Sequence, residues 1–470
     1  MTLAACMMGT IGESWAYTLT LQTSTGGKFR YRISDDGGST WNSWSSYFTS
    51  DQSVTVADGK YVQIAAYPRT DISGKTYYFT KWTGYETVTT YAYSFTVNQN
   101  RTYKCNFTET GRTVNLSINT ANYGTVKISG PFATQTISTT SNTTVTVGNG
   151  ATITLTATPA SNKYFVNYTG TSTQTTYVYT RTVTANCSYK ANFTTEYKTI
   201  KISVNANNWG TAKLSGPVAD KSTTTTTGTS VNVGVGATIS LTGTPATGKY
   251  WVRWKEDDAN AINNASSTYV VADNRDLVAT FTETYYTMTV KSNGDGYVRI
   301  HNGASWSNYV TTTAGISIVA GEGARCTVAA YDPNTTYGSN QGTNKYFVDW
   351  KEGTDVASVA YSYGFDVESA RTLTGYFTTS SCAVTVNASP SAGGTVRIGG
   401  ALPNTAYSAT ATATVGRGAT ITMANSPAAG YILGSWTKDS ATGTVLGYAN
   451  SCTTVVPNSE TASYYANFTT

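Results

Sequence analysis

Gly150-Ala-Thr-Ile-Thr-Leu-Thr-Ala-Thr-Pro159 is the stretch that decides the fold of this chain. Ile153 and Leu155 alternate with threonines, and this period of two residues is typical of a strand that buries one face. The preceding Gly148-Asn149-Gly150 supplies residues that tolerate the positive φ of a turn. Pro159 ends the strand because proline has no N–H to donate to a ladder. The stretch therefore predicts a half-buried strand between two turns.

The same stretch recurs in four further copies along the chain. They span Gly236–Pro245, Gly418–Pro427, Gly323–Pro333 and Gly59–Pro68. An aromatic strand follows each copy, and its last aromatic residue marks the repeat: Trp82, Tyr168, Trp254, Trp350 and Trp436. These markers stand 86 or 96 residues apart, so the chain divides into five modules. We assign the modules to residues 17–110, 111–196, 197–284, 285–380 and 381–470, after an N-terminal segment of residues 1–16.

Each module is predicted to be a sandwich of short strands. Module two has strand-like runs at Thr113–Ile118, Gly124–Ile128, Thr144–Val147, Ala151–Ala157, Lys163–Tyr168, Tyr177–Val183 and Ser188–Thr194. No run of helical length has a helical apolar period. A module of this size can bury its own core, and seven short strands suit a two-layer antiparallel sandwich. Because the linkers between modules are only a few residues long, we expect an all-β, elongated and semi-stiff rod.

The composition excludes several classes of function. Charged residues make up only 12% of the 470, and a net charge of +5 is too dilute to favour nucleic acid or an anionic membrane. No apolar run is long enough for a transmembrane helix. His301 is the single histidine and the acidic turns lack calcium-loop spacing, so we expect no metal and no cofactor. We expect a protein that is not an enzyme, because no local motif suggests a nucleophile, a base and an orienting group.

The order of the motifs resembles a known family. Gly124-Thr-Val126, Gly150–Pro159 and Ala191-Asn-Phe-Thr194, with equivalents in the other modules, are similar to the divergent internalin-type B-repeat family of bacterial surface proteins. The resemblance covers the chain from about residue 17 to residue 469. It implies non-catalytic, extracellular tandem modules that serve as stalks, spacers and adhesive segments. Some members are similar to β-grasp units, so an immunoglobulin-like sandwich and a β-grasp-like module both stay open.

One insertion in module one has a motif of its own. Ser34-Asp-Asp36-Gly-Gly38-Ser-Thr40-Trp41 resembles the Asp-box hairpin of sialidases and other β proteins, in which it is a folding turn and not an active site. Residues 298–306 of module four keep the hairpin but lack the acidic residues. We interpret the motif as a stiff turn.

The tryptophans divide into core residues and surface candidates. Those at the repeat marker are predicted to face inward, because a repeated aromatic on an alternating strand packs in the core. Six others lie outside that slot and are candidates for stacking on sugar rings: Trp15, Trp41, Trp44, Trp209, Trp251 and Trp306. Trp41, Trp44 and Trp306 flank polar turns in which Asp36 and Asn302 can bond sugar hydroxyls, so these five residues form the predicted glycan site. The alternative is that these rings pack under long loops.

A cation recurs at one position of the second strand of every module. The five residues are Arg30, Lys127, Lys213, Arg299 and Arg397. One hypothesis is a cationic face along the rod that meets anionic polymers. The simpler interpretation is a solvated strand face whose charges protect a sheet edge.

The cysteines and the N-terminus bear on location. Cys326 stands where other copies have isoleucine, so it is predicted to be a buried apolar residue. Cys382 and Cys452 share module five and are candidates for a disulfide. Leu3-Ala-Ala-Cys6 resembles a lipoprotein cleavage box without the rest of a signal. This leaves open either a lipid anchor on Cys6 after a truncated start or a chance match.

We therefore predict an extracellular or cell-surface protein that acts as a stalk, an adhesin or a structural matrix component. Its partners would be a surface glycan or host polymer, or further copies of itself in a fibre. The alternative is a bacteriophage virion fibre or capsid decoration protein, because a full signal is missing and the chain ends abruptly at Thr470.

Overall fold

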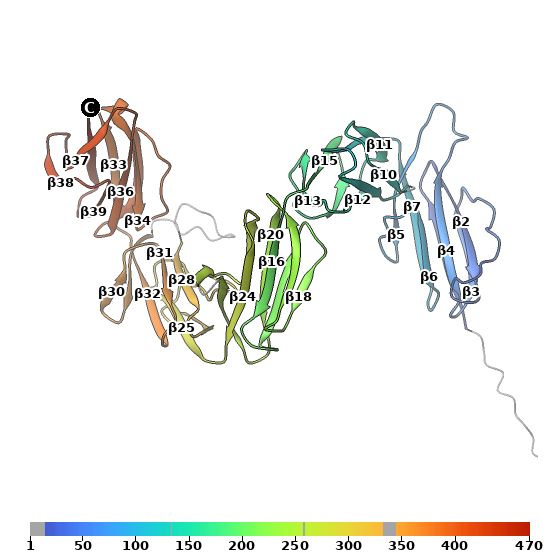
Figure 1. Cartoon of the computed structure of the whole chain (residues 1–470), viewed down its shortest axis with the longest axis horizontal. Helices are drawn as coiled ribbons and strands as arrows, with labels where there is room; N and C mark the ends of the chain where they lie inside the picture. Colours follow the sequence, from blue (N-terminus) through green and yellow to red (C-terminus); the bar gives the residue numbers. More distant parts are fainter. Residues whose placement is uncertain (1–14, 133, 257–258, 332–344) are drawn as a thin grey trace, which may run out of the picture.

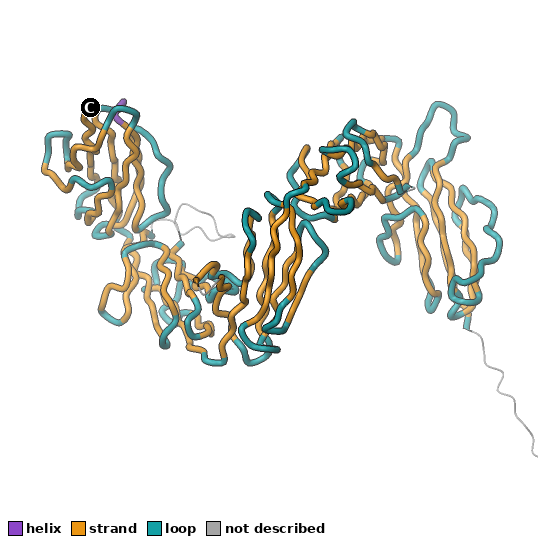
Figure 2. The backbone as a smooth tube through the Cα atoms, in the orientation of Figure 1, coloured by secondary structure: helices purple, strands orange, loops and turns teal. Residues whose placement is uncertain are grey.

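The computed structural model describes residues 15–132, 134–256, 259–331 and 345–470. Within these residues the strands form ten sheets, which pair into five two-layered modules that follow one another in chain order (Figure 1). Strands dominate every module, and the helical part of the described chain is a short 3-10 turn at Ser391–Gly393 (Figure 2). The predicted all-β class and elongated array are confirmed, although the row of modules winds rather than running straight (Figure 1). In the described residues each module consists of two packed sheets with no α-helix across them, so the modules are sandwiches rather than β-grasp-like units.

The first two modules have these strands. Module one contains β1 (Ala16–Thr23), β2 (Gly27–Ser34), β3 (Gln52–Ala57), β4 (Tyr61–Pro68), β5 (Tyr78–Gly84), β6 (Ala92–Thr96) and β7 (Arg101–Thr108). Module two contains β8 (Gly111–Ile118), β9 (Gly124–Ser129), β10 (Gln135–Ile137), β11 (Thr143–Gly148), β12 (Ala151–Pro159), β13 (Tyr164–Gly170), β14 (Val178–Val183) and β15 (Cys187–Thr194). All seven strands predicted for module two are present, and the short β10 is an addition.

The last three modules repeat this order with small additions. Module three contains β16 (Tyr197–Val204), β17 (Gly210–Ser215), β18 (Lys221–Thr223), β19 (Thr229–Gly234), β20 (Thr238–Pro245), β21 (Tyr250–Glu256), β22 (Ala259–Ile262), β23 (Ser266–Val270) and β24 (Arg275–Thr282). Module four contains β25 (Tyr285–Ser292), β26 (Val298–His301), β27 (Ile316–Gly321), β28 (Arg325–Ala330), β29 (Tyr346–Glu352), β30 (Asp355–Ser358), β31 (Ser362–Asp366) and β32 (Arg371–Thr378). Module five contains β33 (Ser381–Ser389), β34 (Gly394–Gly400), β35 (Thr410–Gly416), β36 (Thr420–Pro427), β37 (Ile432–Lys438), β38 (Thr444–Gly447), β39 (Ser451–Val455) and β40 (Thr461–Thr469).

Successive main strands alternate between the two sheets of a module. In module one the sheets have the orders β3-β1-β7-β5 and β2-β4-β6, and the other modules follow the same plan. The pairs are antiparallel, as predicted, with one exception in each module. The first and last strands pair in parallel, as in β1 with β7 and β8 with β15. This pair was not predicted from the sequence, because the partners lie at opposite ends of a module.

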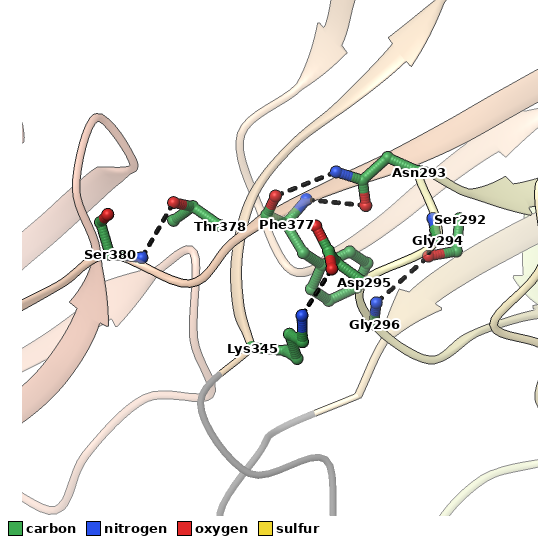
Figure 3. A network of polar contacts seen from close by, with 9 residues as sticks. All are labelled: Ser292, Asn293, Gly294, Asp295, Gly296, Lys345, Phe377, Thr378 and Ser380. Atoms are coloured by element: carbon green, nitrogen blue, oxygen red, sulfur yellow. Dashed lines mark hydrogen bonds and ion pairs between the residues drawn. The ribbon is translucent and has the colours of Figure 1, made fainter.

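In modules two, three and four an asparagine side chain extends the parallel pair beyond its backbone ladder. In module four, Asn293 Nδ2 donates to Phe377 O at 2.9 Å, and Asn293 Oδ1 accepts from Phe377 N at 3.3 Å (Figure 3). Asn119 and Asn205 make the same two bonds in modules two and three, with Phe193 and Phe281. The asparagine thus acts as one more backbone unit and fixes the last strand against the end of the first.

A bulge in each aromatic strand builds the core around the repeat marker. The register of β5 against β7 shifts between Phe79 and Lys81. Phe79 and Trp82 would face opposite sides of a regular strand, but the extra residue turns both rings to the same side, 5.9 Å apart. The same shift occurs in β13, β21, β29 and β37. The four marker tryptophans are fully buried, which confirms their predicted place in the core: Trp82, Trp254, Trp350 and Trp436. Tyr168, at the same position of module two, is fully buried as well.

The four junctions between modules are built alike. Only two residues separate the last strand of one module from the first of the next. The threonine that ends each module accepts a hydrogen bond, at 3.0–3.1 Å, from the backbone N–H two residues on, and these threonines are Thr108, Thr194, Thr282 and Thr378. The second linker residue then accepts a bond of 2.9–3.0 Å from a turn of the next module, and these residues are Thr110, Glu196, Thr284 and Ser380. The second linker residue is therefore held at both its N–H and its carbonyl group.

A glycine at each junction lets the modules come close. Gly148, Gly234, Gly321 and Gly416 end equivalent strands, and a Cβ on any of them would lie 2.7–3.0 Å from the methyl group of the preceding module's terminal threonine. At Gly234 it would also lie 3.1 Å from Cβ of Tyr164. These glycines are needed for close approach rather than for a positive φ.

We expect Gly234→Val to loosen the junction between modules two and three. The added methyl groups have no space against Thr194 and Tyr164, so overpacking should cost about 1–3 kcal/mol and separate the modules. Small-angle scattering of the full chain should change, and proteolysis at the linker Thr195–Glu196 should accelerate. Ser230→Val, on an exposed position of the same strand, is the matched control. Unchanged scattering and unchanged cleavage for Gly234→Val would contradict this view of the junction.

Candidate functional site

The loop of residues 35–51 covers the edge strand of module one. β2 is the outer strand of its sheet, and the loop bonds to it as a further strand would: Phe29 and Phe48 exchange backbone hydrogen bonds of 3.0 and 2.8 Å. The N–H of Ser45 donates to Tyr31 O at 2.8 Å, and Ser45 Oγ accepts from Tyr31 N at 3.0 Å. This covering protects an edge that would otherwise be open to pairing. It also sets the register between the loop and β2.

That register places aromatic rings over cations. Lys28, Arg30 and Arg32 lie on one face of β2 because side chains alternate along a strand. The guanidinium of Arg30 lies 4.4 Å from the Trp44 ring centre, and that of Arg32 lies 4.5 and 4.6 Å from Trp41 and Trp44. We call this set the cation–aromatic ladder: Lys28, Arg30, Arg32, Trp41, Trp44 and Tyr47. The ladder joins two predicted sets, since Arg30 of the cationic face meets Trp41 and Trp44 of the glycan site.

Strand β4 anchors the ladder from its other side. Arg30 Nη2 donates to Tyr67 Oη at 3.0 Å, and Arg32 Nε donates to Gln63 Oε1 at 2.8 Å. The cation–π contacts of Arg30 and Arg32 with the tryptophan rings are each worth about 0.5–2 kcal/mol, depending on how far the cation is desolvated. Arg32, Tyr47 and Tyr67 were not among the predicted residues. The alternation of cations at positions 28, 30 and 32 was the signal that could have indicated Arg32.

Asp36 organises the turn that starts the loop. Asp36 Oδ1 accepts from Thr40 N at 2.8 Å and from Ser34 Oγ at 2.7 Å, and Oδ2 accepts from Thr40 Oγ1 at 2.7 Å. These bonds, above all the one from the Thr40 backbone, hold the pKa of Asp36 well below its usual value. The geometry fits the stiff turn interpreted from the sequence. Both carboxylate oxygens are engaged within the turn.

Module four has a smaller version of the cation–aromatic ladder, with one arginine and two aromatic rings. The guanidinium of Arg299 lies 4.0 Å from the Trp306 ring centre and 4.6 Å from that of Tyr309. Ser307 bonds to Ile300 as Ser45 bonds to Tyr31, so Trp306 and Trp44 are equivalent. Trp306 nevertheless keeps 41% of its surface exposed. Burial, with a smaller effect from Arg299, lowers the pKa of the neighbouring His301.

Asn302 shapes the turn beside Trp306. Its Oδ1 accepts from the N–H groups of Ala304 and Ser305 at 3.1 and 3.0 Å. Its Nδ2 donates to Val319 O at 2.9 Å. Asn302 therefore positions Trp306 through the backbone, as Asp36 positions the start of the loop in module one.

The other three predicted cations lie on equivalent strands but in separate modules. Arg397 lies 4.8 Å from the Tyr407 ring centre, and Lys213 pairs with Asp220 at 2.7 Å. Lys127 is exposed on β9. In modules two and three the short strands β10 and β18 cover the edge in place of an aromatic loop. Of the five predicted cations, Arg30, Arg299 and Arg397 thus lie against aromatic rings.

The remaining tryptophans have different surroundings. Trp251 was counted as a surface candidate, and this was wrong: only 3% of it is exposed, and its Nε1 donates to Asn263 O at 2.8 Å. It takes the place of Phe79 in the aromatic strand and packs in the core of module three. Trp209 lies 4.6 Å from Lys249 Nζ, and Trp15 is 68% exposed.

The cysteines are buried and free in the part of the chain that the structure describes. Cys326 has no exposed surface, as predicted for an apolar core position. Cys382 and Cys452 are free thiols, so the candidate disulfide is absent; burial raises the pKa of both. Cys6 lies outside the described residues. Among those residues, no three metal-binding side chains gather at one place, and no helix is long and apolar enough to cross a bilayer.

Comparisons with known proteins identify two of the modules. Residues 114–196 and 201–284 each match the divergent InlB B-repeat domain family, so modules two and three are tandem copies of that repeat. This confirms the resemblance deduced from the motifs. A search of the curated proteins finds no match to the chain.

Several solved structures are similar at low identity. The Bacillus anthracis TIE protein is 8% identical with a TM-score of 0.15, and the match covers 78% of this chain and 75% of that one. The Streptococcal ancillary pilin is 10% identical with a TM-score of 0.18, covering 57% and 100%. The pilus adhesin SpaC from Lactobacillus rhamnosus GG is 10% identical with a TM-score of 0.15, covering 75% and 56%. At TM-scores this low, the likeness has no bearing on function.

We expect Trp44→Ala to destabilise module one. The substitution removes the ring that both Arg30 and Arg32 contact, and the unfolding free energy should fall by about 1–2 kcal/mol. Denaturant unfolding of the full chain measures this change. Trp15→Ala is the control, because that exposed side chain should change stability by less than about 0.5 kcal/mol. Equal effects of the two substitutions would show that the ladder does not contribute to stability.

Asp36→Asn should make the chain less stable at neutral pH but not in acid. The folded state lowers the pKa of Asp36, so its carboxylate stabilises the fold above the ordinary value of about 3.9. This contribution is lost as the pH falls through the lowered, folded-state pKa. The difference in melting temperature between the two proteins should therefore be constant from pH 7 to about pH 5 and narrow below about pH 4. A melting-temperature difference that does not depend on pH would contradict a stabilising role of the Asp36 charge.

Proposed function

We propose that the chain is a non-catalytic protein of the bacterial surface, a spacer that carries adhesive loops on stiffly joined modules. The observation that carries the proposal is the junction, which uses the same threonine, linker carbonyl and glycine at all four places. Cores also extend across junctions: Ala401 and Ala419 of module five pack into the core of module four. A chain whose linkers are held in this way keeps its loops apart. The match of modules two and three to a B-repeat family supports this function.

The adhesive part of the proposal concerns module four. Trp306 offers a partly exposed indole, and Arg299 places a positive charge against the same ring. Such a pair suits an acidic glycan, because the sugar ring can stack on the indole while the cation attracts a carboxylate or sulfate. In module one the rings of Trp41 and Trp44 are more deeply engaged with Arg30 and Arg32. We therefore assign binding first to Trp306.

We expect Trp306→Ala to weaken the retention of the full chain on acidic glycans and to leave the melting temperature nearly unchanged. Trp350→Ala should do the reverse, since loss of a fully buried tryptophan costs about 3–5 kcal/mol. An array of sialylated, sulfated and neutral glycans measures retention, and calorimetry measures stability. If Trp306→Ala destabilises its module as strongly as Trp350→Ala, the ring is part of the packing. An array without any retained glycan would leave the chain with a spacer function alone.

A further inference from the structure

A cleft opens where module one meets module two. It has a volume of about 370 Å³ and is lined mainly by apolar atoms. Tyr67, Tyr78 and Tyr91 of module one form one wall, and Phe132 and Thr146 of module two form the other. The cleft is continuous with the interface between the modules, because the neighbouring Gly148 would place a Cβ only 3.1 Å from Cβ of Tyr78. It is distinct from the glycan site proposed in module four.

The equivalent place at the third junction is filled by the chain itself. Trp251 stands where module one has Phe79, and its indole extends toward module four. A Cβ on Gly303 of module four would lie 3.0 Å from Cδ1 of that indole. A Cβ on Gly243 would lie 2.1 Å from its Cζ3, so the glycine at this position makes room for the ring. Module one has Ala66 in place of Gly243 and Tyr91 in place of Ala265, and the space between its Tyr91 and Phe132 stays open.

Hydrogen bonds confirm that these positions correspond. The N–H of Gly243 donates to Ala265 O at 2.8 Å, and the N–H of Ala66 donates to Tyr91 O at 2.9 Å. At the third junction the indole N–H is satisfied by Asn263 O at 2.8 Å. The chain thus shows, in one of its own junctions, which kind of group fits between two modules: a planar aromatic side chain.

We propose that the cleft of the first junction binds the aromatic side chain of a partner polypeptide, with a ring no larger than an indole. The apolar lining, to which Tyr67, Tyr78 and Tyr91 contribute, suits a flat aromatic ring. The volume lies within the range of pockets that hold small ligands. A ring in this cleft would touch both modules, so binding should also stiffen the junction.

The test uses N-acetyltryptophanamide as the probe and the full chain as the protein. Equilibrium dialysis counts saturable sites on the wild type and on two variants. Thr146→Trp places a ring in the cleft from an exposed strand position and should remove one site. Val319→Trp, at the equivalent exposed position of module four, is the matched control and should remove none, because Trp251 already fills that junction.

A third variant is expected to gain a binding site for the probe. Trp251→Phe restores the residue found in modules one, two and four and should open the third junction, adding one saturable site. Phenylalanine is native at this position elsewhere in the chain, so the variant is expected to fold. Equal counts for wild type, Thr146→Trp and Trp251→Phe would overturn the proposal. Displacement of the probe by methyl N-acetylglucosaminide at the same concentration would also overturn it, since the cleft would then select a sugar.

Discussion

The parallel pairing of the first and last strands is the constraint on which the array depends. Main strands alternate between two sheets, and the last strand of a module pairs in parallel with the first, so the two run in the same direction. The chain therefore enters each module at one end and leaves it at the other. Had these strands been antiparallel, both termini would lie at one end, and neighbouring modules would fold back on each other. Asn119, Asn205 and Asn293 reinforce the pair where its backbone ladder ends.

Each module has to protect the edge of its smaller sheet, and the surface features arise from that need. Modules two and three cover the edge with the short strands β10 and β18. Modules one and four cover it with loops, and the register of those loops puts Trp44 over Arg30 and Trp306 over Arg299. The loops that protect the sheet edge in modules one and four therefore also carry the candidate binding surface. This explains why the cationic face and the tryptophans, which were two hypotheses at the level of the sequence, coincide in these modules.

The close junctions and the clefts between modules have a common origin as well. Glycines such as Gly148 and Gly234 bring one module against the next, and the space left beside the contact depends on the residue at the position of Phe79. Phenylalanine leaves a cleft at the first junction, whereas Trp251 fills the third. Trp251, together with Gly243 that makes room for it, therefore distinguishes the filled third junction from the open cleft of the first.

The seven main strands of module two, the five repeats and the buried marker tryptophans could be predicted from the sequence, because they depend on local patterns. The alternation around Ile153 set which face is buried, and the recurrence of Trp82 and its equivalents marked the core. Only the tertiary structure decided which strands pair, since β1 and β7 meet across a whole module and no local pattern encodes that contact. It also decided the roles of Trp251 and Trp306. Both lie outside the repeat marker, but a bulge turns one inward while an edge-covering loop holds the other at the surface. Such a difference depends on register between distant segments, which residue types and spacing do not reveal.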